Sequence, residues 1–195
     1  MKRAFLIHGW LGNENRAFFP WLRQQLEVHG FEVHIPAMPN PSFPEYRRWL
    51  ECLTQNILHP DAETLVIGHS IGAKAVLAFL QDLPEGSEVG RVILVAAPLI
   101  VVGAVLLVGE GTSKPWFERP IDAEKIKKVA KDLVLFYSDS DLLVSIENEA
   151  YAREILGVKT IVEHDMGHYH RSGERGAVPK IFAEALRPLA VDSSK

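Results

Sequence analysis

The chain has 195 residues, of which 47% are hydrophobic and 24% are charged, as in an ordinary globular protein. Its formal net charge of −4 argues against a nucleic acid or an anionic membrane as partner. One cysteine, Cys52, excludes an internal disulfide and suits a reducing compartment, so we expect a cytoplasmic protein. We expect one folded domain over residues 1–190 and a frayed tail over residues 191–195.

Short apolar runs alternate along the chain with amphipathic stretches. The apolar runs predict strands at Ala4–Ile7, Glu32–Ile35, Thr64–Ile67, Val92–Ala97, Leu133–Tyr137 and Thr160–Glu163. The amphipathic stretches predict helices at Ala17–Val28, Pro44–Ile57, Ile71–Leu83, Ala123–Val129, Ile146–Leu156 and Val178–Leu186. This alternation predicts an α/β fold of about six mostly parallel strands with helices on both faces. The stretch Gly109–Pro120 is expected to be an irregular insert.

The segment Val92–Val108 is almost wholly apolar and approaches the length of a transmembrane helix. It is shorter than the roughly 20 residues that a helix needs to cross a bilayer, and Pro98 and Gly103 interrupt it. We therefore expect no membrane span, but a buried strand followed by an apolar loop or short helix, Leu99–Val108. That second half is expected either to cover part of a substrate pocket or to pack against the sheet.

A Gly-x-Ser-x-Gly pentad, with Ser70 at its centre, follows the third predicted strand and precedes an alanine-rich helix. A serine in such a strand–turn–helix setting is held in a strained turn above the sheet edge. The glycines at 68 and 72 remove the Cβ atoms that would collide as strand and helix close together. The context predicts a nucleophile elbow of the α/β-hydrolase type, with Ser70 as the nucleophile.

A serine hydroxyl needs a neighbouring base to take its proton, and the base needs an orienting acid. The fifth strand runs into two acids, and of these we favour Asp141, which an apolar group follows, over Asp139. The sixth strand runs into a histidine-rich loop. There we favour His168, which follows a glycine, over His170 and His164.

Three histidines and one acid of this last loop could instead form a metal site, since imidazole and carboxylate suit zinc. The residues of this alternative are His164, Asp165, His168 and His170. The helical His-Glu-x-x-His arrangement is lacking, so we expect no metal and no other cofactor.

Two backbone N–H groups are expected to form an oxyanion hole. One belongs to Ile71, directly after the nucleophile and at a helix N-terminus. The other is assigned to Trp10, in the glycine-containing loop after the first strand. His8 in the same loop is expected to be buried and to organise the loop, and His69 to pack beside the elbow.

With these motifs, the chain resembles the small, lidless serine hydrolases typified by retinoblastoma-binding serine hydrolase and its bacterial relatives. The resemblance runs over nearly the full length, and its motifs are His8-Gly9-Trp10, Phe18–Leu22, Pro36–Pro41, Gly68–Gly72, Pro120–Asp122 with Ile126, Ser138–Val144 and Gly167-His168. It implies a reduced α/β-hydrolase fold with Ser70 as nucleophile, Asp141 as acid and His168 as base.

These features predict hydrolysis of small carboxylic esters or thioesters through an acyl-enzyme. The pocket residues that we expect are Leu11, His69, Val105, Trp116 and Phe117. The alternative is a module that mainly binds another protein. Even in an enzyme, an apolar surface of Leu99–Val108 with Trp116 and Phe117 could bind such a partner.

Overall fold

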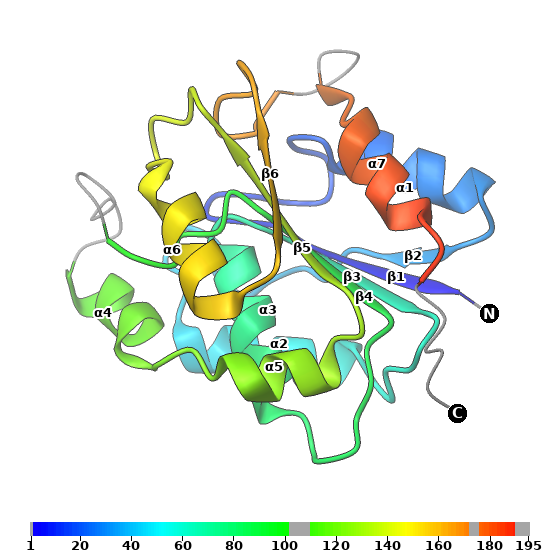
Figure 1. Ribbon diagram of the computed structural model, residues 1–195, viewed down its shortest axis with the longest axis horizontal. Helices are drawn as coiled ribbons and strands as arrows, with labels where there is room; N and C mark the ends of the chain where they lie inside the picture. Colours follow the sequence, from blue (N-terminus) through cyan, green and yellow to red (C-terminus); the bar gives the residue numbers. More distant parts are fainter. Residues whose placement is uncertain (1, 102–109, 172–175, 190–195) are drawn as a thin grey trace.

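A computed structural model describes residues 2–101, 110–171 and 176–189. Six parallel strands form one sheet in the order β2-β1-β3-β4-β5-β6, as Figure 1 shows. The strands are β1 Arg3–Ile7, β2 Glu32–His34, β3 Thr64–His69, β4 Arg91–Val95, β5 Leu133–Ser138 and β6 Lys159–Glu163. The expected α/β class and number of strands are confirmed.

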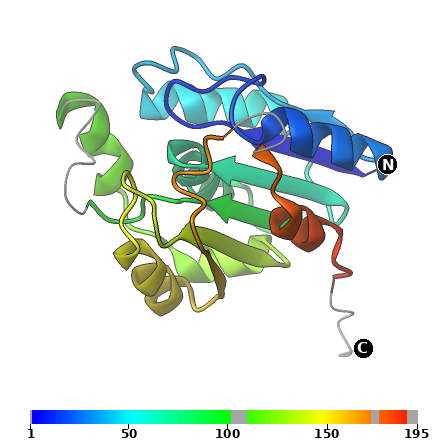
Figure 2. The same ribbon diagram turned by 90° about the horizontal axis from the view of Figure 1, so that it is seen from above.

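Helices cover both faces of the sheet, because successive side chains of a buried strand point to opposite sides. On β1, Ala4 and Leu6 join a core with α1 and α7, whereas Phe5 and Ile7 join a core with α2, α3, α5 and α6. Figures 1 and 2 show α1 and α7 together on one side of the sheet. The helices are α1 Phe19–Val28, α2 Tyr46–Asn56, α3 Ile71–Asp82, α5 Ala123–Val129, α6 Glu147–Leu156 and α7 Pro179–Leu186.

A further helix, α4 Glu110–Glu118, corrects the expectation of an irregular insert at Gly109–Pro120. Its glycine and its internal Pro115 disfavour a helix, and tertiary packing overrides that preference. Trp116 is buried, contacts Trp49 edge-on at 5.8 Å and donates from Nε1 to the carbonyl oxygen of Pro44 at 2.8 Å. In both views α4 lies far from α1 and α7 (Figures 1 and 2).

Part of the apolar segment can be followed past β4. Leu99 is buried, whereas Val101 is 46% exposed. Val105, the rest of the segment to residue 109 and the tail expected at 191–195 lie outside the described residues. No helix in the described parts of the chain is long and apolar enough to cross a membrane.

Helix α3 passes so close to the end of β1 that its second residue, Gly72, has no room for a side chain. A Cβ on Gly72 would lie 2.4 Å from the carbonyl oxygen of His8 and 2.5 Å from that of Ile7. This backbone contact fixes the start of α3 against the sheet.

We predict that Gly72→Ala lowers the free energy of unfolding by about 2–4 kcal/mol, because strand and helix must separate to admit the methyl group. Gly86→Ala is the matched control. Gly86, unlike Gly72, has a positive φ, +84°, and a Cβ there meets no atom within 4 Å. We expect Gly86→Ala to cost about 1 kcal/mol, from its backbone conformation alone. Urea denaturation of both variants measures the difference, and equal losses would contradict this account of Gly72.

Candidate active site

Ser70 stands in the turn between β3 and α3 with φ 55° and ψ −127°, a conformation that is rare for a residue with a side chain. Its N–H donates to the carbonyl oxygen of Val95 at the end of β4, at 2.8 Å. A Cβ on Gly68 would lie 2.6 Å from the Cα of Ala73, so glycine is needed where strand and helix meet. The turn is thus held from both neighbouring elements, and strain of this kind persists only under such support.

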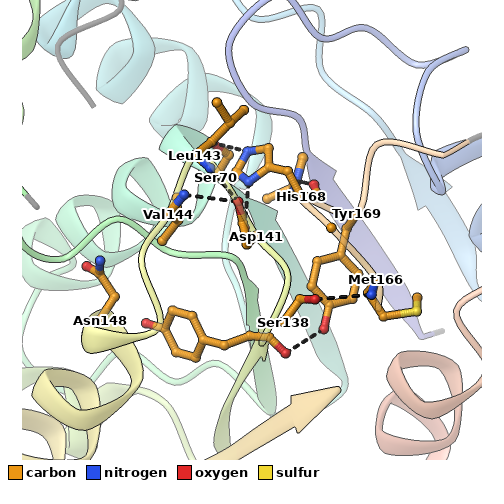
Figure 3. A network of polar contacts seen from close by, with 12 residues as sticks. Ser70, Ser138, Asp141, Leu143, Val144, Asn148, Met166, His168 and Tyr169 are labelled. Carbon is orange, nitrogen blue, oxygen red and sulfur yellow. Dashed lines mark hydrogen bonds and ion pairs between the residues drawn. The ribbon is translucent and has the colours of Figure 1, made fainter. Parts of the chain in front are cut away.

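His168 links the serine to an acid, as Figure 3 shows. Its Nε2 lies 3.0 Å from the hydroxyl of Ser70, and its Nδ1 lies 2.8 Å from Oδ2 of Asp141. Because a carboxylate can only accept, Nδ1 carries the proton and Nε2 is free to accept one from the serine. The side chains of His168 and Asp141 are only 9% and 2% exposed.

The carboxylate of Asp141 is further held by two backbone N–H groups. Its Oδ1 accepts from Leu143 at 2.8 Å and from Val144 at 3.0 Å (Figure 3). This is an Asx-type turn, in which an aspartate side chain accepts from the backbone N–H two residues further along. Because the bond is local, an aspartate at this position is a signal that the sequence itself contains. The apolar side chains matter less than expected, because Leu142 is 95% exposed and only Val144 is buried.

The competing candidates make no hydrogen bond to Ser70 or His168 in the described chain. Asp139 pairs with His164, whose Nδ1 is 2.5 Å from Oδ2, and the side chain of His164 is 90% exposed. His170 is exposed and its ring centre lies 6.5 Å from that of His168. Within the described ranges, no three His, Cys, Asp or Glu side chains are grouped so that they could hold a metal ion.

The two N–H groups expected to form an oxyanion hole belong to residues that line the same cavity as Ser70, namely Trp10 and Ile71. The loop that carries Trp10 approaches the serine closely, since a Cβ on Gly9 would lie 2.8 Å from the Cβ of Ser70. The next residue, Leu11, is tied by its N–H to the carbonyl oxygen of Pro41 at 2.9 Å. The indole of Trp10 donates to the carbonyl oxygen of Ser42 at 2.9 Å, which fixes the loop from a second side.

A cavity of about 500 Å³ opens at Ser70. Of the expected pocket residues, Leu11, His69, Trp116 and Phe117 line it. Trp116 therefore belongs both to the core and to the pocket wall. Lining residues that the sequence did not indicate include Asn13, Asn15, Arg16, Ala17, Phe19, Pro44, Pro98, Leu143, Val144 and His170. Arg16 is the one lining residue among those described whose side chain carries a permanent charge.

Two buried histidines, His8 and His69, form hydrogen bonds with the backbone of loops at the site. His8 is 2% exposed, its Nε2 accepts from the N–H of Met38 at 3.4 Å, and burial lowers its pKa. His69 donates from Nε2 to the carbonyl oxygen of His168 at 2.9 Å. Burial, followed by the nearby His168, lowers the pKa of His69 to about 3, so that this side chain is neutral. His8 thus organises its loop, as expected, whereas His69, which was expected to pack beside the elbow, also holds the backbone of His168.

Asn148 on α6 connects the region after β4 to the acid loop. It is fully buried, and its Oδ1 accepts from the N–H groups of Leu99 at 2.7 Å and Ile100 at 2.9 Å. Its Nδ2 donates to the carbonyl oxygen of Ser145 at 3.1 Å. A single buried amide therefore holds two of the loops that reach the cavity edge.

Comparison with known proteins gives consistent similarities. Residues 4–185 match the family described as serine hydrolase. The chain is 30% identical to the YdeN protein of Bacillus subtilis over 184 residues, 93% of each chain, and 30% identical to the serine hydrolase RBBP9 of Rattus norvegicus over 166 residues, 85% of this chain and 80% of the other.

Solved structures show the same fold. The crystal structure of the ydeN gene product superimposes with a TM-score of 0.86 at 24% identity, covering 94% of this chain and 96% of that one. Est1E from Butyrivibrio proteoclasticus, solved with ferulic acid bound, superimposes with a TM-score of 0.72 at 12% identity, covering 95% and 86%.

The depressed pKa of His69 predicts a loss of stability in acid. The unfolded chain binds a proton at this residue below pH 6.5, whereas the folded protein binds it only near pH 3. Between these two pH values the unfolded state therefore binds more protons than the folded state. As the pH is lowered from 6.5 towards 3, the free energy of unfolding falls by up to about 1.4 kcal/mol per pH unit. We predict that His69→Gln, which cannot titrate but can still donate to His168, flattens this fall in urea denaturation. His59→Gln, at an exposed position, should leave it unchanged.

Proposed function

Since this chain belongs to the serine hydrolase family, we propose that it cleaves small carboxylic esters or thioesters through an acyl-enzyme formed on Ser70. The observation that carries the proposal is the hydrogen-bonded chain from the Ser70 hydroxyl through His168 to Asp141, at 3.0 Å and 2.8 Å. Such a chain lets a neutral imidazole take the serine proton while a buried carboxylate holds its tautomer.

In the first half of the reaction, Oγ of Ser70 attacks the carbonyl carbon of the ester as Nε2 of His168 takes its proton. The imidazolium that forms is stabilised by Asp141, whose charge is already held by two N–H groups. His168 then gives the proton to the departing alkoxide or thiolate, which leaves as the alcohol or thiol. The acyl group remains on the serine.

In the second half, a water molecule gives its proton to Nε2 of His168 and attacks the acyl-enzyme, and the acid product leaves as Ser70 recovers its proton. The negative charge that develops on the carbonyl oxygen in both halves is assigned to the N–H groups of Trp10 and Ile71. Each donor of this kind contributes about 10²–10³ in kcat in other hydrolases. The N-terminus of α3 adds a favourable dipole at the same place.

The cavity favours a small substrate that carries no positive charge. Its volume of about 500 Å³ falls within the roughly 300–1,000 Å³ of pockets that enclose small molecules. Aromatic and aliphatic walls, among them Trp116, Phe117 and Val144, favour an apolar acyl or alcohol group. The described lining contains no Asp or Glu, so a cationic substrate would find no counter-charge there.

The proposal predicts that a fluorophosphonate probe labels Ser70 and that p-nitrophenyl acetate or butyrate is hydrolysed. Ser70→Ala should abolish labelling and reduce kcat by about 10⁴-fold or more, because the nucleophile is removed. Mass spectrometry of the labelled peptide and a chromogenic assay measure the two outcomes. A wild-type protein that neither reacts with the probe nor turns over either ester would refute the proposal.

The choice of acid predicts a contrast between two neighbouring carboxylates. Asp141→Asn should lower kcat by about 10⁴-fold with the fold intact, because the amide would favour the wrong tautomer of His168. Asp139→Asn should lower it less than about threefold, since the amide oxygen still accepts the N–H bond from Asp165 that Asp139 now receives. Steady-state kinetics and circular dichroism test both variants. A larger loss for Asp139→Asn would show that the acid is misassigned.

A further inference from the structure

The loops that carry Asp141 and His168 follow adjacent parallel strands, and their main-chain ladder ends just before the site. Strands β5 and β6 pair up to Ser138 opposite Glu163, and the last backbone bond runs from the N–H of Asp139 to the carbonyl oxygen of Glu163 at 3.1 Å. Beyond this point the two loops need other partners to stay in register. We call the contact between residues 138–141 and residues 164–168 the loop interface.

Two serine hydroxyls take over where the ladder ends. Oγ of Ser138 accepts from the N–H of Met166 at 3.1 Å, and Oγ of Ser140 accepts from the N–H of Gly167 at 3.1 Å (Figure 3 shows the first). The two hydroxyls also bond each other at 3.2 Å. The two residues directly before His168 are thus held, one after the other, by side chains from the neighbouring loop.

The backbone that they hold is strained. Asp165, Gly167 and Tyr169 have φ values of 54°, 55° and 54°, so every second residue around His168 is in the left-handed region. Such a conformation costs of order 1 kcal/mol or more for a residue with a side chain, and it persists only where its surroundings fix it. Hydrogen bonds to the N–H groups of Met166 and Gly167 supply that restraint.

We propose that Ser138 and Ser140 are positioning residues, whose hydroxyls hold the loop of His168 so that its imidazole reaches both Ser70 and Asp141. Neither serine is among the described residues that line the cavity, so the role that we assign to them is indirect. The proposal rests on the role of His168 as base in the proposed function. In the segment 138–141, the two serines thus hold the backbone before His168, and Asp141 holds the imidazole ring of His168.

The outer end of the loop interface differs from this inner part. Asp139 accepts from the N–H of Asp165 at 3.0 Å and pairs with His164, but its carboxylate is open to solvent. The hydrogen bond from His164 lowers the pKa of Asp139. Exposed pairs of this kind contribute little to stability, and water can replace them. Ser138 is buried and Ser140 is half-buried, so their bonds are less easily replaced.

The test removes each hydroxyl and separates positioning from folding. Ser140→Ala and Ser138→Ala should each lower kcat by about 10- to 100-fold with KM within about twofold, because a small displacement of the base slows chemistry more than binding. The second-order rate of fluorophosphonate labelling should fall by the same factor. Ser140→Thr keeps a hydroxyl and should restore most of the activity.

Ser145→Ala is the matched control. Its hydroxyl accepts from the N–H of Glu147 at 3.3 Å, a bond of the same kind within the same segment, but directed into α6. We expect wild-type kcat for this variant. Wild-type kcat in both Ser138→Ala and Ser140→Ala, or a loss in Ser140→Thr as large as that in Ser140→Ala, would overturn the proposal.

A spectroscopic readout keeps the inference distinct from the proposed function. The downfield proton resonance of His168 Nδ1–H reports its bond to Asp141 without any turnover. We expect this resonance to shift or broaden in Ser140→Ala and to stay in place in Ser145→Ala. If the wild-type protein failed to label at Ser70, the proposed function would fail. An unmoved resonance in Ser140→Ala would refute the positioning role whatever the enzyme's activity.

Discussion

The close packing of backbone around Ser70 is the constraint on which the rest of the site depends. Gly9, Gly68 and Gly72 each stand where a Cβ would lie within 3 Å of another element. The chain can therefore bring β1, β3 and α3 together at one point and hold the serine in a conformation that it would otherwise avoid. The same contact places the loop of Trp10 against the serine, so the position of Ser70 and that of the neighbouring loop are fixed together.

His168 and Asp141 are held by a different kind of force. At His168 the described part of the chain shows no such close approach: a Cβ on the preceding Gly167 would meet no atom within 4 Å. Hydrogen bonds from side chains and N–H groups of two adjacent loops fix it instead, and Tyr169 adds a bond from its hydroxyl to the carbonyl oxygen of Tyr137 at 2.9 Å. Around Ser70, where backbones are in contact, a substitution that adds even one atom forces them apart. Around His168, a substitution removes one hydrogen bond of several, which costs about 1 kcal/mol. The two halves of the site should therefore respond differently to substitution.

The pattern of apolar residues and the order of predicted strands and helices were enough to predict the sheet and the edge at which the candidate site lies. Strand runs such as Thr64–Ile67 are apolar throughout because both faces of the sheet are covered. The order of strands then brings Asp141 and His168 to the edge where Ser70 stands. Helix α4 was not predictable from propensity, since its formation depends on the burial of Trp116 against Trp49. The contact of Ser138 was also hidden, because a serine after a strand can have many partners, and only the fold brings the N–H of Met166 to its hydroxyl.

The way in which Asp141 is held has a consequence for how this segment can vary. Within the described chain, the partners of its buried carboxylate are the ring of His168 and the backbone N–H groups of Leu143 and Val144. Side-chain identity at 142 and 143 is therefore of little importance to the charge, and these positions are free to change with the surroundings of the pocket mouth. Proline is the exception at 143 and 144, since it alone lacks the N–H that the carboxylate requires. Sequence change in this loop is therefore limited by the need for a backbone N–H at residues 143 and 144.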